Sequence, residues 1–160
     1  MNVAYLLTGG NTGDRLHYLD AATDAIEHRC GTIIKKSSVW ETAAWGIEKQ
    51  NKFLNRALKL STQLSPFELL DCILQIEQDL GRIRKEKYGP RLIDIDILLF
   101  NDDVIDTRNL TVPHNELSNR RFALQPLAEI ASRKIHPVIK KTIAQLLKLC
   151  PDPLAVDKFN

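Results

Sequence analysis

The stretch Leu92-Ile93-Asp94-Ile95-Asp96-Ile97-Leu98-Leu99-Phe100 tells most about the fold. It is apolar, short and rich in β-branched residues, which favours a buried strand. Successive side chains of a strand point to opposite faces, so the isoleucines and Leu99 are predicted on one face and Asp94 and Asp96 on the other. Residues two apart on a strand have Cα atoms roughly 6.6 Å apart. Both carboxylates are therefore expected to converge on one small volume.

Two carboxylates at this spacing are hard oxygen ligands of the kind that suit Mg²⁺. The alternative is a solvated sheet face whose aspartates pair with arginines. Residues 82–91 precede the strand and carry five basic side chains and one acidic side chain, whereas the whole chain has a net charge of only +2. A basic segment beside paired carboxylates is what a metal–triphosphate site requires, because guanidinium groups bind phosphates bidentately. A solvated loop or an RNA-contacting loop is the alternative for this segment.

Working outward, the apolar patterns predict an α+β fold. Strands are expected over residues 2–8, 32–40, 53–60 and 92–100, and helices over 14–29, 65–80, 120–130 and 140–149. Long loops are expected over 41–52 and 82–90, and a tight turn at Gly9-Gly10-Asn11. The order strand–helix–strand–strand–helix–strand is that of a ferredoxin-like core. We expect a mostly antiparallel sheet covered by helices, in three α-β-α layers.

Length and composition narrow the class of protein. The 160 residues are expected to form one domain, 1–160, and the 44% hydrophobic content is that of a globular protein. The near balance of 22 basic and 20 acidic residues excludes a protein that coats nucleic acid or membrane through a large positive net charge. No apolar run approaches the ~20 residues of a membrane-spanning helix, and no secretion signal is evident. Three widely spaced cysteines make a disulfide framework or a zinc site unexpected and fit a reducing cytoplasm.

Common nucleotide and hydrolase motifs are missing from the sequence. It contains no G-x-x-x-x-G-K-[ST] phosphate loop and no G-x-S-x-G nucleophile elbow. Asn55 offers both a donor and an acceptor for a heterocycle edge, although a sheet-edge amide is the alternative. His114 is a candidate phosphate donor or a structural histidine. Phe53 and Phe122 are candidate stacking rings or core residues.

Residues 87–98, Lys-Tyr-Gly-Pro-Arg-Leu-Ile-Asp-Ile-Asp-Ile-Leu, resemble the signature of the 6-hydroxymethyl-7,8-dihydropterin pyrophosphokinase family of folate biosynthesis. The similarity continues at residues 3–5, 9–11, 53–55, 77, 81–84, 110–114 and 119–122. It implies transfer of the pyrophosphoryl group of ATP to the pterin hydroxymethyl group, with release of AMP. It also implies two Mg²⁺ ions and two small-molecule substrates. We further expect a monomer without nucleic-acid or membrane partners.

The resemblance further assigns roles to single residues. The catalytic set it implies is Arg82, Arg91, Asp94 and Asp96, of which the two aspartates bind the metals. The ATP-binding set is Glu77, Arg84, Ile97, Thr111, His114 and Arg120. The pterin-binding set is Thr42, Ala43, Ala44, Trp45, Phe53, Asn55, Asp94 and Phe122.

Two other functions are compatible with parts of the sequence. One is a ferredoxin-like module that binds nucleic acid through residues 82–91, although the strands lack the aromatic pattern of such modules. The other is a nucleotidyltransferase that uses the same D-x-D metal site and releases pyrophosphate.

Overall fold

The computed structural model describes residues 1–43, 51–81 and 92–160. Its elements are β1 (Asn2–Gly10), α1 (Arg15–Arg29), β2 (Thr32–Lys36), β3 (Trp40–Thr42), β4 (Phe53–Thr62), α2 (Pro66–Asp79), β5 (Asp94–Phe100), β6 (Ile105–Asp106), β7 (Thr111–Val112), a 3-10 turn (Leu117–Asn119), α3 (Arg121–Ala131), α4 (Ile143–Leu149) and β8 (Val156–Lys158). None of the helices in these ranges is long and apolar enough to span a membrane.

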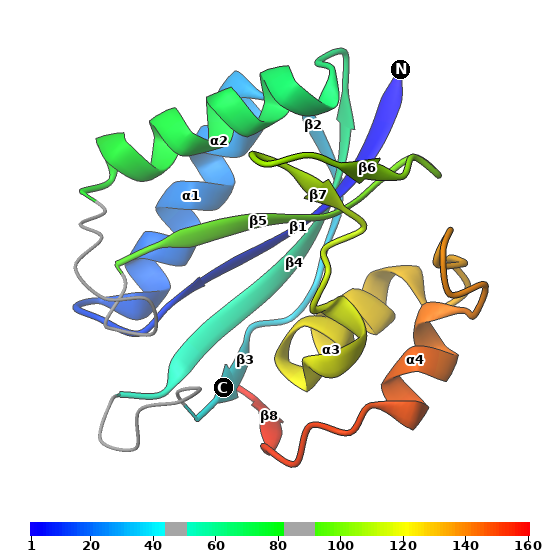
Figure 1. Ribbon diagram of the computed structural model, residues 1–160. Coiled ribbons are helices and arrows are strands. Elements are labelled where there is room, and N and C mark those ends of the chain that lie inside the picture. Colours follow the sequence, from blue (N-terminus) through cyan, green and yellow to red (C-terminus); the bar gives the residue numbers. More distant parts are fainter. Residues whose placement is uncertain (44–50, 82–91) are drawn as a thin grey trace.

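The main sheet has the strand order β5-β1-β4-β3-β8, and β2 pairs with another part of β4 (Figure 1). Each of these pairings is antiparallel. Helices α1 and α2 cover one face of the sheet, and α3 and α4 cover the other, as Figure 1 shows. The predicted ferredoxin-like α+β class and its three layers are thus confirmed.

Each sheet face packs its own hydrophobic core. Leu6, Leu58 and Ile95 face α1 and α2, whereas Leu7 and Leu98 face α3 and α4. The start of α2 follows from its sequence, because Ser65 and Glu68 form a reciprocal capping box and Pro66 occupies the first turn.

Three expectations about the strands need correction. Residues 32–40 form two strands instead of one, because the Ser37 hydroxyl accepts the Ala57 N–H at 2.9 Å and interrupts the ladder. The expected loop 41–52 begins later, since Glu41 and Thr42 belong to β3 and pair with both β4 and β8. The expected turn at Gly9-Gly10 lies inside β1.

The face of Leu99 is also different from the prediction. The pairing of β1 with β5 shifts between Tyr5 and Leu6, so that Tyr5 opposes Leu99 and Leu6 opposes Ile97. This β-bulge places one extra residue, Leu98, on β5. Leu99 consequently packs with the α3 and α4 core, whereas Ile93, Ile95 and Ile97 share one face, as predicted, and that face packs against α1 and α2.

Neighbouring residues on α2 give a test of this packing. The Ile73 side chain is 1% exposed in the core, whereas Leu74 is 39% exposed on the same helix. Ile73→Ala is expected to lower the free energy of unfolding by about 2–5 kcal/mol, because it removes apolar contacts and leaves a cavity. Leu74→Ala is the matched control and should cost less than about 1 kcal/mol. Urea denaturation measures both, and equal losses would contradict this assignment of the helix face.

Candidate active site

Asp94 and Asp96 lie on β5, an outer strand of the main sheet. Asp96 opposes Leu7 and Asp94 opposes Gly9, and Leu7 belongs to the core under α3 and α4. Because directly opposed residues of an antiparallel pair share a face, both carboxylates stand on the α3 side. Both aspartates are half-buried. The two carboxylates therefore lie on one face of the sheet, as the sequence predicted.

A buried amide lies in the same row of residues, across β1. Gly9 opposes Asp94 on one side and Asn55 of β4 on the other. The Asn55 side chain is 4% exposed and its Nδ2 donates to the Thr8 carbonyl at 3.4 Å. Its Oδ1 has no hydrogen-bond partner within the described part of the chain. A buried acceptor without a partner costs stability, so it indicates a ligand that donates to it.

Gly9 makes this arrangement possible, and sequence reasoning missed its role. A Cβ atom at this position would lie only 2.2 Å from the Asn55 Nδ2 atom. The absence of a side chain at Gly9 therefore lets the Asn55 amide lie over β1, in the same row of residues as Asp94. The available signal was a glycine at the end of an apolar strand, and it was interpreted as a turn.

Glu77 and Ile97 were both expected to contact ATP. Glu77 of α2 is 2% exposed, and its Oε2 accepts the Ile95 N–H at 2.8 Å, at the backbone position between the two aspartates. Its carboxylate thus positions β5. The Ile97 side chain is 5% exposed in the core under α1 and α2, on the face away from the aspartates. A contact of Ile97 with the nucleotide would have to use its main chain.

His114 and Thr111 follow the outer edge of β5. The His114 N–H donates to the Leu98 carbonyl at 2.9 Å, which fixes this segment along β5. The His114 Nδ1 accepts the Glu116 N–H at 3.2 Å, so the ring hydrogen is assigned to Nε2. Burial lowers the pKa of His114 below its usual value, and the Arg120 guanidinium lowers it further, while Glu116 and Asp94 oppose the shift. The imidazole is thus neutral at pH 7 and offers one N–H donor.

The remaining candidates for the pterin side come from three elements. Phe53 is at the start of β4, two positions from Asn55 and on the same strand face. Phe122 is in the first turn of α3, with the Arg120 guanidinium 5.6 Å from its ring centroid. Thr42 is 3% exposed, and its hydroxyl donates to the Ala155 carbonyl at 3.0 Å. Thr42 is thus available to a ligand mainly through its backbone.

The other predicted site residues border the ranges that the structure does not describe or fall within them. Ala43 is exposed directly after β3. The candidates that lie outside the described residues are Ala44, Trp45, Arg82, Arg84 and Arg91.

Sequence reasoning did not single out Arg15, which donates from one guanidinium nitrogen to Glu41 at 2.7 Å and to the Lys52 carbonyl at 2.8 Å. Arg15 thereby joins β3 to the residue that precedes β4. Nothing in its local sequence indicated this contact.

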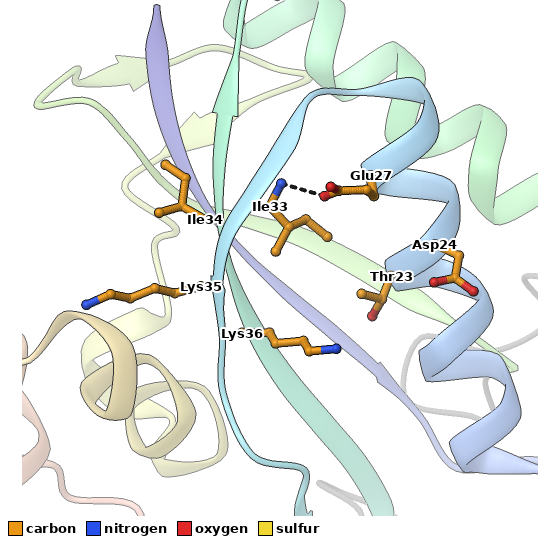
Figure 2. A pocket seen from close by; sticks show the side chains of 7 residues that line it. All are labelled: Thr23, Asp24, Glu27, Ile33, Ile34, Lys35 and Lys36. Atoms are coloured by element: carbon orange, nitrogen blue, oxygen red, sulfur yellow. Dashed lines mark hydrogen bonds between the residues drawn. The ribbon is translucent and has the colours of Figure 1, made fainter.

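A hollow of about 310 Å³ between α1 and β2 is distinct from this site. It is lined by Thr23, Asp24, Glu27, Ile33, Ile34, Lys35 and Lys36 (Figure 2). Its acidic and basic side chains lie on opposite sides, and Glu27 accepts the Ile33 N–H. β2 pairs with β4, and β1 separates β4 from β5 in the sheet. The hollow therefore contains none of the candidate catalytic residues.

The pKa of His114 makes a prediction about stability. The unfolded chain binds a proton at about pH 6.5, while the folded protein resists protonation until lower pH. The free energy of unfolding should therefore fall as the pH drops below 6.5 towards the folded pKa. His114→Gln should show a shallower fall between pH 7.5 and 5.5 in urea denaturation. Buried His136, whose pKa burial also lowers, is present in both proteins. Parallel curves would contradict a neutral, buried His114.

The antiparallel sheet with its half-buried aspartate pair and its buried amide is compatible with a transferase that acts on phosphorylated substrates. A model of the 7,8-dihydro-6-hydroxymethylpterin-pyrophosphokinase (HPPK) family matches residues 5–132, and the chain belongs to this family. The resemblance found in residues 87–98 is thereby confirmed. As a pyrophosphokinase the chain is an ATP-dependent diphosphotransferase, and neither a nucleic-acid module nor a nucleotidyltransferase is favoured.

Curated relatives carry the corresponding name. The 2-amino-4-hydroxy-6-hydroxymethyldihydropteridine pyrophosphokinase of Bacillus subtilis (strain 168) is 47% identical over 133 residues, 82% of this chain and 80% of that one. The protein of the same name from Aquifex aeolicus (strain VF5) is 46% identical over 145 residues, 91% of this chain and 90% of that one. Similarity at this level extends along most of both chains.

Solved structures support the fold. The Plasmodium falciparum HPPK-DHPS wild type with SDX-DHP has a TM-score of 0.76 at 20% identity, covering 93% of this chain. The chain spans 43% of that longer protein. At this identity the likeness concerns the fold alone, and it agrees with the ferredoxin-like arrangement in Figure 1.

Proposed function

We propose that this chain transfers the pyrophosphoryl group of ATP to the hydroxymethyl group of 6-hydroxymethyl-7,8-dihydropterin, as a step of folate biosynthesis. The hydroxymethyl oxygen bonds to the β-phosphorus of ATP, and the bond between that phosphorus and the bridging oxygen of AMP breaks. The products are the pterin diphosphate, AMP and the proton of the hydroxyl group. Family membership and the 46–47% identical relatives named for this activity support the assignment.

The observation that carries the proposal is the row Asp94, Gly9 and Asn55 across three strands. It places Asn55 Oδ1, a buried acceptor with no partner among the residues that the structure describes, next to the strand position that opposes Asp94. A dihydropterin has ring N–H and amino donors along one edge and the hydroxymethyl group at the other end. We propose that Asn55 accepts from the donor edge, so that the hydroxymethyl group is directed to the aspartates.

The residues present fit a hard divalent cation. Asp94 and Asp96 contribute carboxylate oxygens from one strand face, while no thiol is found among the residues placed there. We propose that these two aspartates hold two Mg²⁺ ions together with the phosphates of ATP. When bound, Mg²⁺ supplies neutralisation of phosphate charge and a lower pKa for the attacking hydroxyl group.

The chain's own residues have separate tasks in this proposal. The neutral His114 donates its Nε2 hydrogen to a phosphate oxygen, and Thr111 lies on the same segment. Glu77 holds the Ile95 N–H and thereby keeps both aspartates in register. Phe53 and Phe122 offer ring faces to the pterin. Arg82, Arg84 and Arg91 are proposed, from the family resemblance alone, to bind the phosphates.

Product analysis tests the reaction. The chain is mixed with ATP and Mg²⁺, with or without 6-hydroxymethyl-7,8-dihydropterin, and the nucleotides are separated. AMP that forms only when pterin is present is the expected result. ADP would indicate transfer of a single phosphoryl group, and free pyrophosphate would indicate nucleotidyl transfer. Either outcome would contradict the proposal.

We also propose the domain organisation, the compartment and the oligomeric state of this enzyme. We propose one domain over residues 1–160, since α4 packs with α3 and β8 pairs with β3 beyond the matched range 5–132. We propose that it acts as a cytoplasmic monomer on small molecules, without nucleic-acid or membrane partners. Its three free cysteines support a reducing compartment. Light scattering during size-exclusion chromatography tests the monomer.

A further inference from the structure

Two cysteines that are 42 residues apart in the sequence meet between α1 and α2. The Sγ atoms of Cys30 and Cys72 are 2.7 Å apart, which is about 0.7 Å longer than a disulfide bond. Cys30 caps the C-terminus of α1, and Cys72 lies within α2. The third cysteine, Cys150, packs in the core on the opposite face of the sheet. The pair therefore lies apart from the candidate active site and has no task in the proposed reaction.

The surroundings hold these two helices in place. Arg29, next to Cys30, forms an ion pair with Asp79 at the end of α2, with an N–O distance of 2.8 Å. The Cys72 thiol also lies 3.6 Å from the Arg29 carbonyl oxygen. The Thr62 hydroxyl donates to the Cys30 carbonyl at 2.6 Å, which fixes the end of α1 against β4. The two sulfur atoms are thus brought together by contacts on both helices, and bonding them requires little movement.

The two thiols differ in access to solvent. Cys30 is 4% exposed, whereas Cys72 is only half-buried. Burial raises the pKa of Cys30, and the hydrogen bond with Cys72 raises it further. Because Cys72 is partly open to solvent and Cys30 is buried, an oxidant in solution should react first at Cys72. Cys30 is then placed to complete the bond from inside the protein.

We propose that Cys30 and Cys72 are a reversible oxidation site that joins α1 to α2 by a disulfide. The oxidant is a hydroperoxide such as hydrogen peroxide. The Cys72 sulfur attacks one peroxide oxygen, which gives Cys72 sulfenic acid and water. The Cys30 sulfur then bonds to the Cys72 sulfur, and the sulfenic oxygen leaves as a second water molecule with the Cys30 proton. Two thiols have lost two electrons and two protons, and a dithiol reductant reverses the change.

Hydrogen peroxide at a small molar excess tests the site on the 160-residue chain. The expected product is a monomer lighter by two hydrogen atoms, whose titratable thiols fall from three to one. Trypsin without reductant should release peptide 30–35 linked to peptide 60–82. The bond closes a loop of about 40 residues, so Tm should rise on the order of 10 °C. Dithiothreitol should reverse both changes.

Variants separate the proposed bond from other oxidation products. Cys150→Ser is the matched control and should retain the linked peptides and the rise in Tm. Cys72→Ser, at a half-buried position, and Cys30→Ala should each abolish both. Unlinked peptides with sulfinic acid at Cys72 would overturn the proposal. Dimers linked through Cys150, or an equal Tm rise in Cys72→Ser, would also overturn it.

Discussion

Asp96→Asn is expected to lower the rate of AMP formation by about a thousandfold or more, with an unchanged Tm. The substitution keeps the shape of the side chain but removes the negative charge that neutralises a cation between enzyme and phosphates. Asp96 is half-buried on the α3 face and opposes Leu7, so asparagine fits without new contacts in the core. Steady-state turnover with saturating ATP, pterin and Mg²⁺ measures the effect.

Asp103→Asn is the matched control for this experiment. Asp103 is exposed in the turn that follows β5, so the same loss of charge should leave turnover within about twofold of the unmodified protein. If folded Asp96→Asn retained more than a tenth of the turnover, the proposed metal site on β5 would be wrong. If both variants lost activity equally, the effect would come from overall charge.

Asn55→Leu is expected to weaken pterin binding by about a hundredfold while the affinity for ATP stays the same. A site built to accept a hydrogen bond discriminates strongly when that bond is removed. The same change should leave Tm equal or slightly higher, because it removes a buried amide oxygen without a partner in the described structure. Calorimetric titration with each substrate, together with thermal denaturation, gives all three quantities.

Gln63→Leu provides the control for Asn55→Leu. Gln63 is an exposed amide directly after the other end of β4, so its replacement should affect neither substrate. Unchanged pterin affinity in Asn55→Leu would show that the amide serves the sheet alone. A marked loss of Tm would show that the amide stabilises the sheet, which would contradict the expected Tm.

Much of the fold could be predicted because local patterns agreed with tertiary packing. The alternation of isoleucine and aspartate fixed the faces of β5, and Ser65-Pro66-Phe67-Glu68 marked the start of α2. Local patterns carry no information about pairing between distant segments. The bulge at Leu98 and the strand β8 depend on such pairing, and they were missed. The two short strands β6 and β7 are too brief to show a period.

The sequence singled out candidate side chains for the site more readily than the contacts that position them. Asp94 was singled out as a polar residue on an apolar strand, whereas Asn55 and His114 were singled out by their hydrogen-bonding groups and by the family resemblance. The contribution of Gly9 is the space that it leaves for the Asn55 amide, which is visible only once β1 and β4 are paired. The contact of Cys30 with Cys72 likewise depends on how α1 and α2 pack.

The row Asp94, Gly9 and Asn55 runs perpendicular to the strands, so the distance between its residues is set by the spacing of the strands. Neighbouring strands are about 4.8 Å apart, and two steps from β5 to β4 therefore separate the backbones of Asp94 and Asn55 by about 9.6 Å across the sheet. This length is set by main-chain hydrogen bonds and does not adapt to the ligand. Because the Asn55 amide lies over Gly9, a ligand that contacts both Asn55 and Asp94 would have to match a separation that is set by the sheet.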